Sequence, residues 1–377
     1  MATRIHYVIN ARIPHVRAYG IQIAKMTEAL IEAGAQVTIV IPRTLASHAD
    51  MQQVNGLRTP VRTVVVRGLD WSDKGRIPFF IGSLVFMVSS FIFLRSEKKK
   101  GNVDAVYTVD MDTFSYALLP LTGIPCFAEM HGAKRPSIAN RLFFKRARGV
   151  IATNKEIESS LTHTFGIPSA RITVQPNGVD VAQISNVPQK SEARAELGIP
   201  ADAQVALYAG RFYGWKGLEI LPRAAALAHD IQWYVIGGSE ESFKQFAGVT
   251  ELPENLHVAG DKPVDAIPKW LTSADTLLIL GTRAHEQSYR YTAPMKVYEY
   301  MAARRPIIAA GTPALTGIIA ESDALFYTPD DAADLARLVK NIVAIDSSPM
   351  TERAFRSAIE HSWSKRAERV LSFVSSI

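Results

Sequence analysis

The strongest candidate for a chemical site lies between residues 288 and 303, where a polar loop joins a buried strand to a helix. Residues 276–280 form an apolar run with the length of a buried strand, and Thr292 followed by Pro294 fits a helix start. Such a helix directs free N–H groups and its positive dipole end towards an anion. Glu299, two turns later, is placed to accept hydrogen bonds from sugar hydroxyls, although an ordinary surface Glu explains the pattern equally well.

A second candidate is the glycine-punctuated loop after the strand expected at 205–209. It contains Gly210, Arg211 and Lys216. A planar guanidinium fork beside a compact ammonium suits a pyrophosphate. The loop is not a Walker A motif, because the G-K-[ST] ending is absent. Gly237 ends the next strand, at a point where a nucleotide can pass close to the backbone.

The first half offers His131, which directly follows the strand expected at 125–130 and precedes a glycine. Ligands of open α/β sheets bind at the carboxyl ends of strands, although a structural turn His is the alternative. The loop after the first strand carries Arg12 and Arg17, which suit an anionic substrate but are also typical of solvated loops. This loop lacks G-x-G-x-x-G, which argues against a nicotinamide or flavin dinucleotide site.

Strands and helices alternate along the whole chain, which predicts parallel sheets. A length of 377 residues exceeds the usual size of one hydrophobic core and favours two domains. We expect a polar linker at 181–203, with domains at 1–185 and 186–362 and a last helix at 363–377 that packs back on the first domain. The single Cys126 excludes an internal disulfide and favours a reducing cytoplasm.

Residues 78–94 are the most apolar segment, and a basic cluster of Arg95, Lys98, Lys99 and Lys100 follows them. Their length is at the lower limit for a membrane span, roughly 17 residues. A crossing would separate the strands expected at 61–66 and 103–109. Small residues at 82, 83, 89 and 90 share one helical stripe, where another element can approach closely. We favour a helix that docks in the lipid interface over a plain packing helix or a true span.

Charge is distributed unevenly. The net charge is +6, but residues 1–100 alone carry 14 Lys and Arg against 6 Asp and Glu. This excess predicts an anionic surface opposite the first quarter of the chain. Nucleic acid is not expected as a partner, because no recognition module accompanies the charge.

Taken together, the motifs resemble those of the family 4 retaining glycosyltransferases of GT-B fold. The motifs, in chain order, are Ala-Tyr19-Gly20-Ile-Gln, Glu-Met-His131-Gly, Pro-Asn-Gly-Val-Asp, Gly210-Arg211 with Lys216-Gly, and Ala293-Pro294-Met295-Lys296-Val-Tyr-Glu299-Tyr-Met-Ala. The resemblance implies an α/β fold of two Rossmann-like α/β/α domains with parallel sheets facing across a cleft, the acceptor side first and the donor side second.

By this resemblance, Arg211 and Lys216 would hold the donor diphosphate, Glu299 the nucleotide ribose, and His131 the donor sugar. The residues at 291–296, with Gly210 and Gly237, would complete the donor site, and the loop from Arg12 to Gly20 would face the acceptor. The family's usual first Glu is replaced here by Tyr291, and Glu286 is a speculative substitute. No resident metal or cofactor is expected.

The function implied is retaining transfer of a sugar from a nucleotide-sugar donor to a lipid-linked or glycan hydroxyl in cell-envelope polysaccharide or glycoconjugate synthesis. We place it at the cytoplasmic membrane face, docked on anionic lipid through residues 78–100. The alternatives are an inactive sugar-nucleotide-binding partner and a nucleotide-sugar epimerase of the same fold. The sequence does not specify the donor base, donor sugar, acceptor, linkage or oligomeric state.

Overall fold

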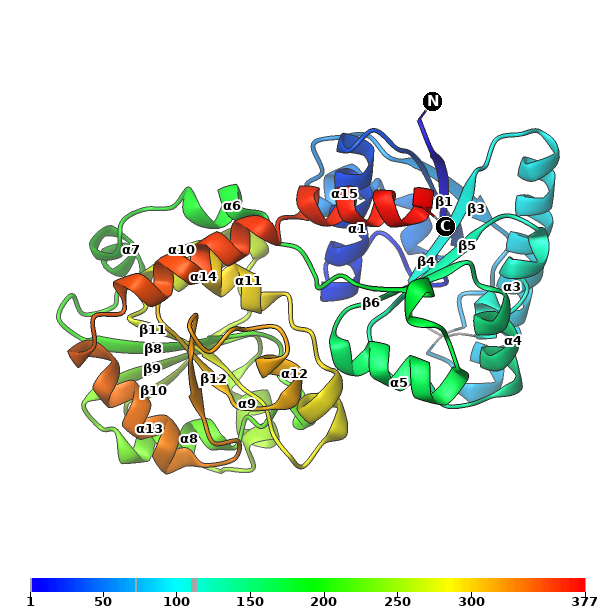
Figure 1. The fold of residues 1–377 in the computed structure, drawn as a ribbon. Coiled ribbons are helices and arrows are strands. Elements are labelled where there is room, and N and C mark those ends of the chain that lie inside the picture. The colour runs from blue at the N-terminus through cyan, green and yellow to red at the C-terminus, as the bar shows by residue number, and fades with distance from the viewer. Residues whose placement is uncertain (1, 72, 110–113, 377) are drawn as a thin grey trace. The chain divides into compact units, whose positions relative to one another are not determined.

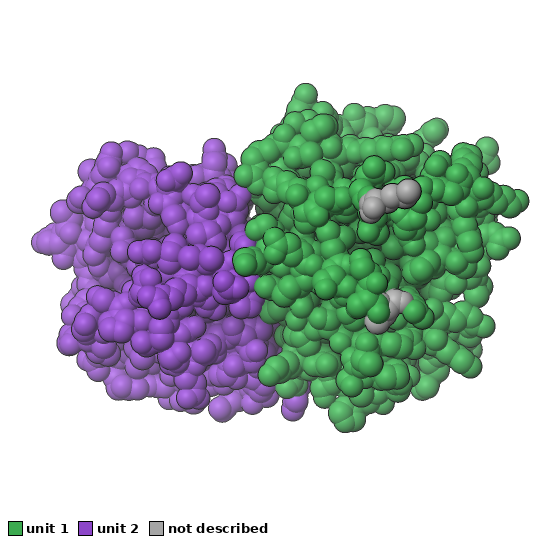
Figure 2. Space-filling view, turned by 45° about the horizontal axis from the view of Figure 1, so that its top comes forward, with its two compact units in different colours: residues 1–177, 363–377 green, residues 178–362 purple. Residues whose placement is uncertain are grey.

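The chain folds into two compact α/β units. The structure, a computed structural model, describes residues 2–71, 73–109 and 114–376. The first unit comprises residues 1–177 and 363–377, and the second comprises residues 178–362 (Figure 2). The boundary therefore falls eight residues before the predicted one. The predicted linker is not an open linker either, because residues 181–203 include the helices α6 (Val181–Ser185) and α7 (Lys190–Leu197).

The first unit contains a parallel sheet of seven strands in the order β3-β2-β1-β4-β5-β6-β7. Its strands are β1 Arg4–Val8, β2 Gln36–Pro42, β3 Arg62–Val66, β4 Ala105–Val109, β5 Cys126–Met130, β6 Gly149–Ala152 and β7 Ile172–Val174. The central strands β4, β5 and β6 are buried at every residue, as expected for a sheet covered on both faces.

Helices surround this sheet (Figure 1). They are α1 Ala18–Glu32, α2 Met51–Asn55, α3 Arg76–Lys99, α4 Ile138–Arg146, α5 Lys155–Phe165 and α15 Trp363–Ser376, with short 3₁₀ turns η1 Ala46–His48, η2 Phe114–Tyr116, η3 Leu119–Thr122 and η4 Ser169–Arg171. The last helix, α15, packs against α1, the first helix of the same unit. Both ends of the chain thus contribute to one unit.

The second unit contains a parallel sheet of six strands in the order β10-β9-β8-β11-β12-β13. Its strands are β8 Gln204–Ala209, β9 Ile231–Ile236, β10 Leu256–Gly260, β11 Thr276–Ile279, β12 Ile307–Ala310 and β13 Leu325–Tyr327. Its other helices and turns are η5 Gly214–Lys216, α8 Ile220–Leu227, α9 Glu240–Ala247, η6 Val264–Ala266, α10 Ile267–Ser273, η7 Gln287–Tyr291, α11 Lys296–Ala302, α12 Pro313–Thr316, α13 Ala332–Asn341, η8 Ile342–Ala344 and α14 Ser348–Glu360. The predicted strand–helix alternation is therefore confirmed.

The helix predicted to start at Thr292 begins four residues later. Lys296 is the first residue of α11, Met295 is its N-cap, and the preceding turn η7 is π-helical. Thr292 has an extended backbone. A proline disfavours helical backbone at the residue before it, so Pro294 stops the helix from extending back through Ala293. At seven residues, α11 has only about two turns, so we assign the anion contacts of this site mainly to side chains.

Helix α3 is long and apolar enough to cross a membrane by length and composition, and 33% of its most apolar stretch is buried. The strands on either side of it, β3 and β4, belong to one sheet, which argues against a span. Its small residues Gly82, Ser83 and Ser90 are buried. A Cβ at Gly82 would lie 3.0 Å from the Leu69 carbonyl oxygen, so the predicted close approach is confirmed.

The opposite face of α3 is apolar and exposed. Its exposed side chains recur at helical spacing and are Ile77, Phe80, Ile81, Leu84, Val88 and Ile92. The basic cluster at its end is only partly free. Lys98 donates to the Gly123 carbonyl at 2.7 Å and Lys100 pairs with Glu97 at 2.9 Å, which leaves Arg95 and Lys99 as the cations with no such partner among the described residues.

Candidate functional site

The loop after β8 holds two of the predicted cationic residues. Lys216, the last residue of η5, donates to the Arg211 backbone oxygen at 3.0 Å. Its ammonium lies 5.0 Å from the centre of the Tyr213 ring and 5.6 Å from that of Trp215. These rings attract a cation without neutralising it. The Arg211 side chain is exposed.

A third cation, Lys296, lies beside this loop. Its Nζ is 3.8 Å from the centre of the Tyr208 ring, and a Cβ placed on Gly210 would collide with it. Tyr208 belongs to β8, so the strand that precedes the loop also supports the Lys296 ammonium. The sequence did not identify Tyr208 as a site residue, because Tyr208 lies within an apolar run that predicts only a buried strand.

The three cations have no acidic partner in the part of the chain that the structure describes. Among the described residues, no carboxylate lies within ion-pair distance of Arg211, Lys216 or Lys296. Burial, followed by the charge of Arg211, lowers the pKa of Lys216 to about 8. Burial and the charge of Lys216 hold the pKa of Lys296 well below its usual value, although Glu299 acts in the opposite direction. Neighbouring like charges without counter-ions favour binding of an anion.

Glu299 lies on α11, one turn after Lys296. Burial raises the pKa of its carboxyl, and the charge of Lys296 opposes that rise. The helix is fixed to the end of β8 by Tyr300, whose hydroxyl accepts from the Ala209 N–H at 2.9 Å and donates to the Ala209 carbonyl at 3.2 Å. This anchor holds Lys296 and Glu299 at the carboxyl end of the central strand.

The predicted polar loop before α11 is organised by the π-helical turn η7, which contacts η5. Ser288 Oγ accepts from the Thr282 N–H at 3.1 Å, and Tyr291 donates to Glu286 Oε1 at 3.4 Å. Tyr291, which stands where the family usually has Glu, is thus tied to Glu286. The sequence Thr292-Ala293-Pro294-Met295 continues from this turn to Lys296, so the structure brings the predicted donor-site residues together.

The ends of β8 and β9 approach each other closely at two glycines. The Gly210 N–H donates to the Ile236 carbonyl at 2.8 Å. Gly237 has φ +129°, and a Cβ on it would collide with the Gly210 carbonyl. Any other residue at 237 would displace the loop that carries Arg211.

In the first unit, His131 follows β5, as predicted. Its Nε2 lies 2.7 Å from Oε1 of Glu129, a fully buried carboxylate on β5. Glu129 lies two residues before His131 in the Glu-Met-His-Gly motif, and the motif alone predicts no role for it. The signal that could have found it is an acidic residue inside an otherwise apolar strand, which needs buried partners.

The loop after β1 has less free charge than predicted. Arg12 pairs with Asp70 at 2.6 Å and with Asp73 at 3.0 Å, so its charge is already neutralised. Arg17 is exposed at the N-cap of α1. Tyr19 donates to the Arg12 carbonyl at 3.4 Å, and a Cβ on Gly20 would collide with the His15 carbonyl. Arg17, and not Arg12, remains the available cation of this loop.

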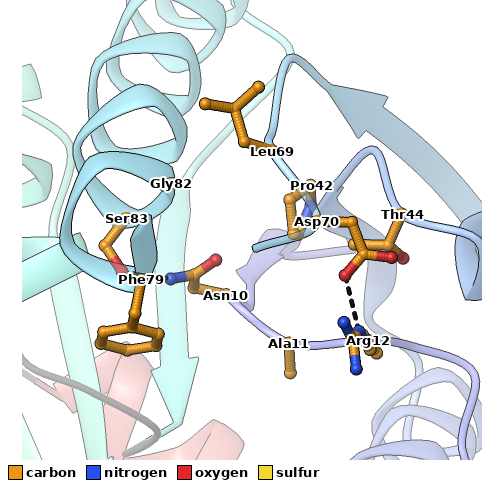
Figure 3. Close-up of a pocket in the computed structure, with 10 residues that line it drawn as sticks. All are labelled: Asn10, Ala11, Arg12, Pro42, Thr44, Leu69, Asp70, Phe79, Gly82 and Ser83. Carbon is orange, nitrogen blue, oxygen red and sulfur yellow. Dashed lines mark hydrogen bonds and ion pairs between the residues drawn. The ribbon is translucent and has the colours of Figure 1, made fainter. Parts of the chain in front are cut away.

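A pocket opens at the carboxyl ends of β1 and β2, beside α3 (Figure 3). Asn10 points towards Ser83 of α3, with 3.2 Å between its Nδ2 and the serine oxygen, and Arg12 meets Asp70 on the other side. The buried Thr44 Oγ1 in its wall has no hydrogen-bond partner among the described residues. The pocket thus offers hydroxyl, amide and carboxylate groups rather than net positive charge.

Within residues 2–71, 73–109 and 114–376, no group of three or more His, Cys, Asp or Glu side chains is placed to hold a metal ion. The buried Cys126 is not a candidate nucleophile, because burial raises the pKa of its thiol to about 12.

Two family descriptions match the chain. "Glycosyltransferase Family 4" matches residues 20–183, and "Glycosyl transferases group 1" matches residues 189–360. Among curated proteins, D-inositol 3-phosphate glycosyltransferase 1 of Catenulispora acidiphila is 27% identical over 59% of this chain and 56% of its own length. The corresponding protein of Xylanimonas cellulosilytica is 23% identical over 79% of this chain and 76% of its own length. The chain spans about half the length of the first curated relatives it matches.

Solved structures of low sequence identity share the fold. A glycosyltransferase from Rickettsia africae superposes with a TM-score of 0.77 at 16% identity, over 99% of this chain and 98% of its own. The Anabaena protein HepE in complex with UDP-glucose superposes with a TM-score of 0.71 at 15% identity, over 99% of this chain and all of its own. With two parallel α/β units and both halves matched, the chain belongs to the family 4 glycosyltransferases of GT-B fold.

Proposed function

We propose that this protein transfers a sugar from a nucleoside-diphosphate sugar to an acceptor hydroxyl with retention of configuration. The observation that carries the proposal is the cluster of Arg211, Lys216 and Lys296, which no carboxylate of the described residues pairs with, next to the partly buried carboxyl of Glu299. The cations suit a diphosphate, and the carboxyl suits the two hydroxyls of a ribose. Since HepE was solved with UDP and UDP-glucose, a uridine diphosphate sugar is the first donor to test.

In this mechanism the leaving nucleoside diphosphate gains negative charge as its bond to the sugar breaks. Arg211, Lys216 and Lys296 stabilise that charge from fixed positions, which lowers the barrier. His131 contacts the donor sugar, and the acceptor hydroxyl gives its proton to the departing phosphate on the same face. No resident metal is required, because the cations of the chain meet the phosphates. Activity should therefore survive treatment with a chelator.

A panel of nucleotide sugars tests the proposal. Thermal shift should first identify the donor, since a ligand at 100 times its Kd adds about 2.7 kcal/mol to the free energy of unfolding. Release of nucleoside diphosphate with and without candidate acceptors then measures transfer. Interconversion of sugars without any acceptor would instead identify an epimerase, and binding without turnover an inactive partner.

The first prediction concerns the diphosphate contacts. Arg211→Ala or Lys216→Ala should each lower the rate of nucleoside diphosphate release about a hundred- to a thousandfold, because each removes about 2.7–4 kcal/mol of transition-state stabilisation. Lys340→Ala, an exposed lysine on α13, is the matched control and should leave the rate unchanged. Full activity in both site variants would refute the assignment.

The second prediction concerns Glu299. Glu299→Gln should weaken UDP binding by about 1–3 kcal/mol, because an amide replaces a carboxylate that accepts hydrogen bonds from ribose hydroxyls. Isothermal titration calorimetry measures the change, and the exposed Glu321→Gln serves as control. A Glu299 variant that binds UDP normally but unfolds at a lower temperature would show a purely structural role.

The third prediction is a pH dependence. The pKa of Lys216 is about 8 in the free protein, because burial and Arg211 disfavour its charge. A bound diphosphate favours the charged form and raises this pKa, so binding must take up a proton above pH 8. The affinity for UDP should therefore fall as the pH rises from 8 to 9.5, and Lys216 alone should contribute at most about tenfold per pH unit.

Calorimetry in buffers with different ionisation enthalpies would detect this proton uptake directly. Lys216→Arg keeps a positive charge at every pH of this range, so residue 216 should no longer take up a proton when UDP binds. Lys296 acts in the same direction, so a smaller dependence should remain. A UDP affinity that stays constant between pH 8 and 9.5 would contradict the prediction.

The acceptor side of the proposal places the enzyme on the cytoplasmic membrane face, with a lipid-linked acceptor. Two basic, partly apolar helices support it. Helix α3 exposes its apolar face beside Arg95 and Lys99. Helix α4 exposes Ile138 and Leu142 one turn apart, beside the basic residues Arg141, Lys145 and Arg146. Both helices contact the turns η2 and η3, and Leu121 of η3 is exposed as well. An anionic leaflet matches this combination of apolar and basic groups.

The fourth prediction tests this docking by co-sedimentation with vesicles. The wild-type protein should pellet with anionic vesicles, and Ile81→Ser with Val88→Ser should lower the bound fraction by removing apolar contact. The double variant Arg95→Glu and Lys99→Glu should lower the bound fraction only with anionic vesicles, and this loss should be smaller at high salt. Val343→Ser, an exposed valine of the second unit, is the control. A wild-type protein that stays in solution at low salt would make a soluble acceptor the better proposal.

A further inference from the structure

The Glu129 carboxylate is the centre of a buried network in the first unit. Its exposed fraction is 0%, and its two oxygens accept hydrogen bonds from side chains of four different segments. Oε1 accepts from Gln22 of α1 at 2.8 Å, from His131 at 2.7 Å and from Arg366 of α15 at 2.8 Å, and Oε2 accepts from the Tyr107 hydroxyl of β4. Segments from both ends of the chain thus converge on one group.

Arg366 supplies the positive charge of this network. It is fully buried, and Glu129 is its only carboxylate partner among the described residues. Its Nε donates to the Pro176 carbonyl at 2.7 Å and its Nη1 to Met26 Sδ at 2.9 Å, while Nη2, the nitrogen that faces Glu129, also donates to the Gln175 carbonyl at 3.3 Å. The guanidinium is therefore held in one orientation from both sides.

This arrangement keeps Glu129 ionised. Burial alone would raise the pKa of its carboxyl, but the charge of Arg366 and the hydrogen bond from His131 bring it down to about 2. An ionised carboxylate can only accept hydrogen bonds. The Nε2 atom of His131 must then carry the hydrogen, and in the neutral ring Nδ1 is left with a free lone pair.

Stability alone is a weak reason for such a pair. Burying two charges costs several kcal/mol per ion, and apolar residues of similar volume often replace a buried ion pair without loss. The network does something that apolar residues cannot do, because it gives the partly exposed His131 ring one tautomer and one orientation. The side chain of His131 is 30% exposed, so a ligand can reach it.

We propose that Arg366 is a positioning residue: through Glu129 it fixes the tautomer and orientation of His131, so that Nδ1 accepts a hydrogen bond from a hydroxyl of the donor sugar. This inference rests on the proposed function, since it gives His131 a donor contact. It makes the last helix of the chain part of the first unit's site. Gln22, in the motif after β1, supports the same carboxylate.

A spectroscopic experiment tests the inference without an activity assay. Ring ¹⁵N shifts of His131, assigned with His131→Ala, should show a protonated Nε2 and an unprotonated Nδ1 in the wild-type protein. Arg366→Met combined with Glu129→Gln removes both charges together and so leaves no unpaired buried ion. In this double variant the single-tautomer pattern should be lost. A protonated Nδ1 in the wild type, or an unchanged pattern in the double variant, would overturn the proposal.

The kinetic arm uses UDP-glucose and measures UDP release. The double variant should lose about a hundredfold in kcat, because misplacing a contact by about 1 Å costs that much, while UDP affinity stays unchanged. Arg366→Lys keeps the positive charge but loses the planar guanidinium, and it should retain intermediate activity. This single variant also tests the proposal if the double variant does not fold. Arg369→Gln, on the same helix but bonded to Gln175, is the control with unchanged turnover.

The variants separate the two proposals. If the His131→Ala variant has the same kcat as the wild type, His131 does not contact the donor sugar, and the further inference is refuted as well. If His131→Ala is impaired while the double variant is fully active, the donor contact stands and the role of Arg366 is wrong. A double variant that only melts at a lower temperature, with normal kcat, would show that the network is structural.

Discussion

Every strand pairing in both sheets is parallel, and this constraint decides where side chains of each unit can meet. The carboxyl ends of parallel strands lie at one edge, so the loops that follow them are neighbours. In the second unit this edge gathers Gly210, Gly237 and Lys296, which are far apart in sequence. In the first unit it gathers Asn10 after β1 and His131 after β5. The register of buried strands thus sets the geometry of both candidate sites.

Buried charge is paired with an opposite charge in the first unit, whereas like charges lie together in the second. In the first, the Glu129 carboxylate is matched by Arg366 and three further donors, so no charge is left over. In the second, no carboxylate among the described residues pairs with Lys216 or Lys296, and burial together with a neighbouring positive charge lowers the pKa of both. The first arrangement fixes geometry permanently. The second carries an electrostatic cost in the free protein that an anionic ligand removes, which favours binding over a purely structural role.

The sequence predicted the parts of the structure that follow from local pattern. Apolar runs located the strands, and glycine with basic residues located the loop at Arg211 and Lys216. It failed where side chains distant in sequence interact. The neutralisation of Arg12 by Asp70, and the burial of Arg366 against Glu129, depend on contacts that no local spacing encodes. It also misplaced the start of α11, because the effect of Pro294 on the preceding residue outweighed the apparent cap at Thr292.

The surface of helix α3 allows a comparison of the apolar and the electrostatic contributions to the free energy of membrane binding. Its buried face combines small residues with Phe86, Met87 and Leu94, and its exposed face is also largely apolar, whereas an ordinary surface helix exposes polar and charged side chains. Removing one large apolar side chain fully from water is worth about 1.5–3 kcal/mol. A basic residue near an anionic leaflet is worth about 1 kcal/mol, and Lys98 and Lys100 are already engaged within the unit. The exposed apolar face would therefore supply most of the binding free energy, and the free cations would mainly orient the helix towards an anionic surface.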